Sequence, residues 1–204
     1  MATVEDLQKR LAALAEAVQT PVPPLKVVPD PKGHTVPAYV RKDDLSSAAY
    51  LQVTDRLVAA DPAEQTWYLA AALGWWTSPL PRRRRRQAVA AVGAVIVAYG
   101  GWLLVDVFDA PVPGWAPWLA FGLSAFALPV ALAAVMRRGQ RALDAAGHDV
   151  LRSAGHDPAA LARQVFGNRP RPSWFARLVG TEPSPATRIA DAERARSLPA
   201  RPLF

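Results

Sequence analysis

The chain has 204 residues, no cysteine and a formal net charge of +7 at pH 7. Its length allows one soluble domain of modest size plus one further feature. The lack of cysteine excludes disulfides and thiolate metal sites. A positive charge suits phosphate binding, but no aromatic-and-basic motif accompanies the arginines, so we expect no nucleic-acid partner.

An amphipathic helix is expected in the N-terminal segment, residues 1–20. Thr3 and Asp6 have the spacing of a capping box, which predicts a helix over residues 3–19. Its apolar residues recur every three or four positions, which predicts packing against the rest of the soluble part, with a partner helix or a membrane surface as the alternative. These residues are Val4, Leu7, Leu11, Leu14 and Val18.

Residues 21–86 are predicted to form a cytoplasmic α+β part. Three short segments have β character, at Leu25–Val28, Thr35–Val40 and Ala49–Val53, and they predict a small sheet or hairpin beside helices. Asp61 and Pro62 supply an N-cap and a first-turn proline, which predicts a helix over residues 62–76.

Two long stretches without charge follow, and each is long enough to cross a hydrocarbon core of roughly 30 Å. They predict a transmembrane hairpin over residues 87–136, with spans at about 87–105 and 115–135. Arginines flank both stretches, so the positive-inside rule predicts a two-pass protein of the cell (plasma or inner) membrane with both termini in the cytoplasm and the lipid bilayer as a partner. The flanking arginines are Arg82, Arg83, Arg84, Arg85, Arg86, Arg137 and Arg138.

Two further features support that hairpin. Trp102, Trp115 and Trp118 lie where an interfacial aromatic belt is expected. Small residues repeat every four positions, which predicts close packing of the two helices, or docking of a partner's helix as the alternative. These residues are Ala90, Ala94 and Ala98 in the first span and Ala116, Ala120 and Ser124 in the second.

Residues 137–190 are predicted to complete the cytoplasmic domain. Gly155 and the Asp157-Pro158 start signal divide this part into two helices. The segment 191–204 has little to bury, so we expect it to be mobile or ordered only on a partner.

Nothing in the spacing of the polar residues indicates a catalytic or cofactor site. The histidines are His34, His148 and His156, and no two of them are four residues apart as in a helical metal site. No nucleophile elbow and no glycine-rich phosphate loop is present, so we expect no cofactor.

The order of the parts resembles a known family over roughly residues 25–190. "LAAALGWW" (69–76) is followed by the apolar stretches, then by "GQRALDAAG" (139–147), "GHDPAAL" (155–161) and "GTEPSPATRIADAE" (180–193). This order is similar to that of the HtpX-type membrane zinc metallopeptidases, relatives of the CAAX prenyl endopeptidases. The resemblance implies a predominantly helical α+β fold, a metallopeptidase-like cytoplasmic domain interrupted by the membrane hairpin, and a sheet edge that binds an extended peptide.

The chain departs from the family at the positions that carry the chemistry. The family's two zinc-binding histidines fall at Ala71 and Trp75, and its general base falls at Ala72. Its third ligand falls at Gln140 and a later histidine falls at Glu182. Other motif positions are kept, namely Asp144, Thr181, Pro183, Arg188 and Ile189.

These replacements remove the groups that peptide hydrolysis requires. A zinc peptidase needs a bound metal to polarise the carbonyl and a carboxylate to accept a proton from water. Alanine offers neither a lone pair nor a proton acceptor, and the tryptophan indole is only a donor. We therefore expect no metal and no peptidase activity.

The resulting hypothesis is a catalytically inactive, metallopeptidase-like integral membrane protein. It would act as an accessory or scaffold subunit that binds another membrane protein or complex, and a homo-oligomer is compatible with this role. The alternatives are an unrelated two-span interaction protein, a protein held to its partner or to the anionic leaflet by Arg82–Arg86, and an enzyme with another site. That last site would combine His34, Asp144, His148 or Glu182.

Overall fold

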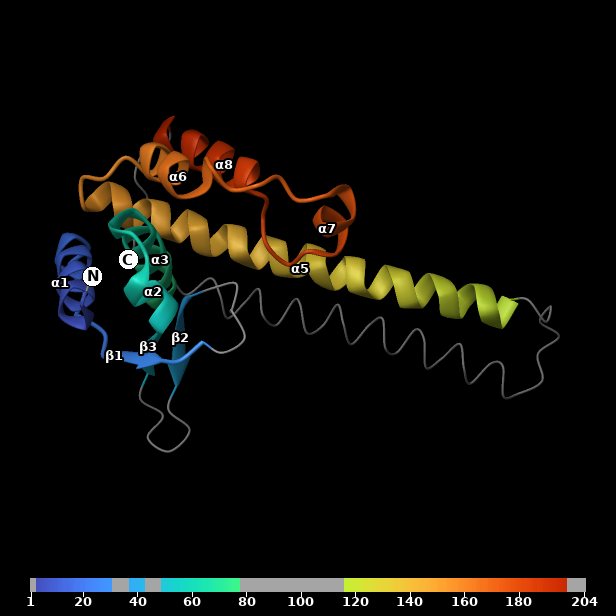
Figure 1. The fold of residues 1–204 in the computed structure, drawn as a ribbon, viewed down its shortest axis with the longest axis horizontal. Helices are drawn as coiled ribbons and strands as arrows, with labels where there is room; N and C mark the ends of the chain where they lie inside the picture. Colours follow the sequence, from blue (N-terminus) through green and yellow to red (C-terminus); the bar gives the residue numbers. More distant parts are fainter. Residues whose placement is uncertain (1–2, 31–36, 43–48, 78–115, 198–204) are drawn as a thin grey trace. The chain divides into compact units, whose positions relative to one another are not determined.

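The computed structural model describes residues 3–30, 37–42, 49–77 and 116–197 (Figure 1). The chain divides into two compact units. The first unit contains Met1–Leu80, Arg141–Arg171 and Ser184–Phe204, and the second contains Pro81–Gln140 and Pro172–Pro183. The described residues are mostly helical, with one three-stranded sheet in the first unit.

The sheet has the strand order β1-β3-β2, with β1 at Leu25–Val28, β2 at Ala38–Lys42 and β3 at Ala49–Thr54. β1 runs parallel to β3, and β2 runs antiparallel to it. The first and third strands lie where the sequence predicts them, whereas β2 starts and ends later than the predicted segment. No described strand pairs with the second side of β2. Whether a peptide binds along that edge stays a prediction.

One face of the sheet forms part of the core. Leu51 and Val53 of β3 are fully buried, and the register places Leu25 and Val27 beside them on β1. Because side chains alternate along a strand, Gln52 lies on the opposite face, where its Nε2 donates a hydrogen bond of 2.6 Å to the hydroxyl of Tyr39. The apolar side of this alternation faces the helices.

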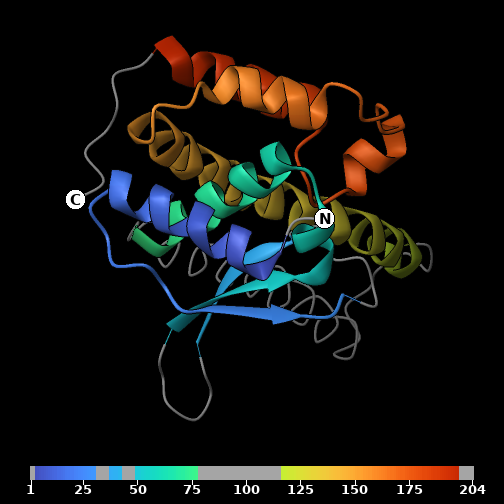
Figure 2. The same cartoon turned by 60° about the vertical axis from the view of Figure 1, so that its left-hand side comes forward.

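The helices of the first unit cover that face in layers (Figure 2). α1 and α3 lie over the sheet, and α6 and α8 lie beyond α3. Their bounds are Val4–Ala17 for α1, Asp55–Ala59 for α2, Pro62–Thr77 for α3, Pro158–Phe166 for α6 and Pro185–Ser197 for α8. The first unit also contains the last part of α5, from Arg141 onward.

α1 begins at the predicted capping box. The Thr3 hydroxyl accepts a hydrogen bond of 3.2 Å from the Asp6 amide, and the Asp6 carboxylate accepts one of 2.8 Å from the Thr3 amide. Leu7, Leu11 and Leu14 are buried in the core. The predicted stripe therefore packs against the rest of the first unit at Leu7, Leu11, Leu14 and Val18, whereas Val4 is 40% exposed.

α3 is the central helix of the unit. Its N-cap is Asp61, whose carboxylate accepts hydrogen bonds of 2.8 and 2.9 Å from the amides of Ala63 and Glu64. Nearly every residue from Ala63 to Gly74 is buried, so the helix is apolar on all sides. A helix of this kind requires neighbours all round it, and α1, β2 and α6 supply several of them.

The predicted transmembrane hairpin over residues 87–136 is wrong. In the parts of the chain that the structure describes, no helix combines the length and the apolar character that crossing a membrane requires. The two-pass inner-membrane location with cytoplasmic termini is corrected with it. The first predicted span, 87–105, lies outside the described residues.

The physical reason is visible in α5, which covers Ala116–Ser153. α5 begins at the start of the second predicted span but continues without a break beyond position 135. That continuation carries Arg137, Arg138 and Arg141, so the apolar and the charged parts belong to one unbroken helix. An apolar stretch of sequence is thus only part of a longer, charged helix.

The segment from Asp191 also differs from its prediction as a mobile tail. α8 extends to Ser197, and its Ala192 is fully buried. The Asp191 carboxylate pairs with Arg141 of α5 and Arg194 of α8. These contacts order the first half of a segment whose composition alone suggests too few apolar residues.

Candidate functional site

The residues that the resemblance would place in the family's zinc helix lie on α3. Ala71 and Ala72 are buried, and Trp75 is half-buried. Gly147 of α5 lies directly against Ala71, since a Cβ added at Gly147 would be 2.8 Å from the Ala71 Cα and 3.2 Å from its Cβ. Ala71, where the resemblance would place the first histidine, therefore faces the backbone of α5.

A second glycine completes this close contact. A Cβ added at Gly74 of α3 would lie 2.5 Å from the carbonyl carbon of Ala146 and 2.8 Å from the amide nitrogen of Gly147. The two helix backbones thus approach each other through Gly74 on one side and Gly147 on the other. A longer side chain at Ala71 would meet the α5 backbone unless it turned aside.

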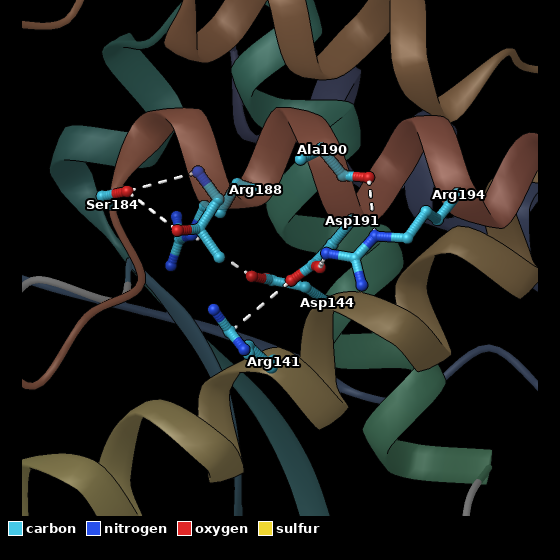
Figure 3. Close-up of polar contacts among 8 residues, drawn as sticks. Arg141, Asp144, Ser184, Arg188, Ala190, Asp191 and Arg194 are labelled. Atoms are coloured by element: carbon cyan, nitrogen blue, oxygen red, sulfur yellow. Dashed lines mark hydrogen bonds and ion pairs between the residues drawn. The ribbon is translucent and has the colours of Figure 1, made fainter.

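A buried ion pair lies beside this contact (Figure 3). The Arg188 Nε of α8 is 3.2 Å from the Asp144 Oδ2 of α5, and the two side chains are only 2% and 3% exposed. Arg188 Nη1 also donates a hydrogen bond of 3.4 Å to the Tyr68 hydroxyl of α3, and its guanidinium lies 4.9 Å from the ring centre of Phe166 of α6. One side chain therefore joins four helices.

Asp144 and Arg188 are two of the residues that the resemblance would mark as kept motif positions. The structure brings them into direct contact, although they are far apart in the chain. Tyr68 and Phe166, which surround Arg188, were not predicted. Tyr68 is part of the apolar run of α3, and nothing in its sequence position indicates a hydrogen-bond partner on α8.

A more exposed set of charges surrounds the same helices. Asp191 lies 3.6 Å from Arg141 and 2.6 Å from Arg194 (Figure 3). Both arginines are more than half exposed, and such surface pairs contribute little to stability. The free energy of unfolding therefore depends more on the buried pair than on the surface pairs.

His148 lies one helical turn after Asp144 and is 2% exposed. Its ring meets the edge of Trp67 at a centroid distance of 5.2 Å. Burial lowers the pKa of His148 from 6.5 to about 4, while Asp149 and Asp191 oppose this shift weakly. The imidazole is therefore neutral at physiological pH and forms part of the core.

The described residues contain no group of three or more His, Cys, Asp or Glu side chains that could hold a metal ion. Of the alternative enzyme site, only Asp144 and His148 are seen together, and Asp144 is engaged by Arg188. Glu182 and Gln140 belong to the second unit, and His34 lies outside the described residues.

The second unit shows a different role for an arginine predicted at the membrane interface. Arg137 Nη1 donates hydrogen bonds of 2.9, 3.0 and 2.6 Å to the carbonyl oxygens of Arg177, Leu178 and Gly180. These carbonyls lie at the end of α7, Trp174–Val179, so Arg137 closes that helix. Arg138 is exposed.

The remaining predicted interface and packing residues fall outside the described part. Arg82–Arg86, Trp102, Trp115, Ala90, Ala94 and Ala98 belong to undescribed segments, as do the side chains of Ala116, Trp118, Ala120 and Ser124. These residues were predicted to mark the interface of the transmembrane hairpin or to pack its helices, and that hairpin is corrected above.

Comparison of the chain with models of protein families, with curated proteins and with solved structures found no match.

The close contact of α3 with α5 predicts opposite effects for two glycine substitutions. Gly147→Ala should lower the free energy of unfolding by about 1–3 kcal/mol, because its methyl group would overlap the Ala71 backbone. Gly139→Ala on the same helix is the control. It meets nothing within 4 Å and should be neutral or stabilising by up to about 1 kcal/mol. Urea denaturation of both variants measures the difference, and equal effects would contradict the packing.

The buried ion pair predicts a large loss when one partner becomes neutral. Asp144→Asn leaves the Arg188 charge buried without its counter-ion and should lower the free energy of unfolding by about 3–5 kcal/mol. Asp191→Asn removes a carboxylate that pairs at the surface and should cost about 1 kcal/mol or less. Chemical denaturation at one pH compares them, and a loss at Asp144 no larger than at Asp191 would refute the pair's importance.

His148 predicts a specific loss of stability in acid. Its pKa is about 4 in the folded chain and 6.5 in the unfolded one, so the unfolded chain binds the proton first as the pH falls. Above pH 6.5 His148 does not change the free energy of unfolding. As the pH falls from 6.5 to 4, protonation of this residue in the unfolded chain lowers that free energy, by about 3 kcal/mol at pH 4.

The measurement is the free energy of unfolding of the wild type and His148→Phe between pH 7 and pH 4. The variant should lose less stability than the wild type over this range, because it has no imidazole to protonate. His156→Gln, at an exposed position, serves as the control and should follow the wild type. Parallel curves for wild type and His148→Phe would sink the prediction.

Proposed function

We propose that the chain is a non-catalytic, metallopeptidase-like protein that acts as an accessory or scaffold subunit by binding another protein. The observation that carries this proposal is the packing of Ala71 against Gly147. Where the resembled family has a metal ligand, this chain has a methyl group that faces the backbone of the next helix. Asp144 and Arg188, at positions that the resemblance marks as kept, support the proposal because they form a buried pair.

A metallopeptidase-like arrangement of helices that lacks the metal ligands and the general base favours binding over catalysis. An alanine at the position of the general base cannot accept a proton from water. The helix that carries it is buried on nearly all sides and serves as the centre of the core. We infer that this helix has become a structural element that supports surfaces elsewhere on the chain.

The second unit offers such a surface at α7. Trp174 is 76% exposed and Phe175 is 50% exposed, and their rings form an edge-to-face pair with centroids 5.8 Å apart. Exposed aromatic pairs are uncommon, and Trp and Arg are the residue types that contribute most to protein interfaces. Arg177, between them and the end of α7, is also exposed and gives the surface a positive charge.

The first measurement tests the lack of catalysis. Purified full-length chain should contain no stoichiometric zinc by elemental analysis, and it should show no chelator-sensitive cleavage of unstructured peptides. Stoichiometric zinc together with such cleavage would overturn the proposal.

The second measurement tests the surface on α7. The tagged chain should co-purify with a defined partner from its native cell, and Trp174→Ser/Phe175→Ser should reduce the recovered partner at least tenfold. Val22→Ser, which replaces an exposed apolar residue of the first unit, is the matched control and should retain it. Full retention by the aromatic double variant would place the interface elsewhere and refute this surface.

A further inference from the structure

A hollow of about 220 Å³ lies in the first unit beside α1, away from the contact of Ala71 with Gly147. α1 contributes Arg10, Ala13, Leu14 and Ala17, which follow one face of the helix. Thr66 of α3 and the residues Ala154 and His156, in the turn after α5, complete the lining.

The lining combines apolar walls with a cation. Ala13, Leu14, Ala17 and Ala154 supply methyl and methylene groups. Arg10 is half-buried, and among the described residues no group accepts a hydrogen bond from its buried Nε. A buried donor without an acceptor is costly, so a ligand that supplies the acceptor would gain more than an ordinary surface contact.

The other polar groups in or near the hollow carry no free negative charge toward it, so Arg10 determines which charge a ligand must have. The Thr66 hydroxyl donates its proton to the Pro62 carbonyl at 2.7 Å, so it can only accept from a ligand. The nearby carboxylate of Asp6, one turn before Arg10, is bonded to the amide and hydroxyl of Thr3. His156 has an exposed ring at the rim and can add a second N–H donor.

We propose that this hollow binds a carboxylate attached to a short, branched aliphatic chain. A guanidinium matches the two oxygens of a carboxylate, and the apolar walls match the branched carbons. At about 30 Å³ for each water-sized group, the volume holds about seven such groups, which corresponds to 3-methylbutanoate. A phosphate would meet a single guanidinium and mostly methyl groups, so it fits less well.

A carboxylate on a short, branched aliphatic chain occurs in two kinds of ligand. One is a free small acid, and the other is the last residue of a peptide that ends in valine or leucine. The full-length chain is titrated by methyl and amide NMR with 3-methylbutanoate, with an acetylated peptide ending in valine and with the amide of that peptide. Both carboxylates should shift the signals of Leu14, Ala13 and Ala154 in a saturable way, and the amide should bind at least tenfold more weakly. Tighter binding of the peptide acid indicates a peptide terminus, and tighter binding of 3-methylbutanoate indicates a free acid.

Two variants test the contributions of charge and space. Arg10→Gln should weaken binding of either acid about tenfold or more, because it removes a charged donor. Ala17→Leu should abolish binding by filling the hollow with no change in charge. Lys9→Gln, which removes an exposed cation that does not line the hollow, should bind as the wild type does.

The results that would overturn the proposal are specific. Unsaturable or absent shifts with both acids, equal binding of acid and amide, or unchanged binding by Arg10→Gln would each do so. Equal shifts with inorganic phosphate at matched ionic strength would also overturn it, since they indicate a general anion site. None of these results bears on the zinc content or the α7 surface, so this inference fails or stands apart from the proposed function.

Discussion

The ion pair between Asp144 and Arg188 is the interaction on which the core of the first unit depends. Two charges that are almost fully removed from water must each find compensation inside the protein. Arg188 is compensated by the carboxylate of α5, the hydroxyl of Tyr68 and the face of Phe166. The positions of α3, α5, α6 and α8 are therefore coupled through one guanidinium, and a shift of any of these helices would expose or isolate a charge.

The contact between α3 and α5 explains why the buried charges lie close to Ala71. Gly74 and Gly147 allow the two backbones to approach more closely than any larger residue would permit. This approach places Asp144 and His148 in the core, where Asp144 pairs with Arg188 and burial keeps the His148 imidazole neutral. The chain thus uses the space between these helices for close packing.

Local signals in the sequence predicted local structure well. The capping box at Thr3 and the Asp61-Pro62 start signal both work through hydrogen bonds within a few residues, and both are present as predicted. The strand Leu25–Val28 also lies where its β-branched residues suggest. Features that depend on distant residues were harder to foresee, because a sequence window contains only one of the two partners.

The predictions that proved wrong have the same physical origin, because they too depend on residues outside the local stretch of sequence. The stretch before Arg137 predicts a membrane span because it is uncharged and long enough to cross a bilayer, whereas it forms part of α5, a longer helix that also carries arginines. The tail from Asp191 was expected to be mobile because it has few apolar residues, yet Ala192 and the partners of Asp191 order it. In the site, Asp144 and Arg188 could be named from their motifs, but their contact and the roles of Tyr68 and Phe166 could not.

The division of the chain has a consequence for its synthesis on the ribosome. The sheet, α1, α2 and α3 are made first, but the other helices that pack against α3 come from residues beyond Arg141. Until α5, α6 and α8 emerge, the part of the α3 surface that packs against these later helices has no partner, and contacts of such long sequence separation form slowly. The nascent chain must therefore expose an apolar helix for the time needed to translate the second unit, which makes it a substrate for chaperones that bind exposed apolar segments.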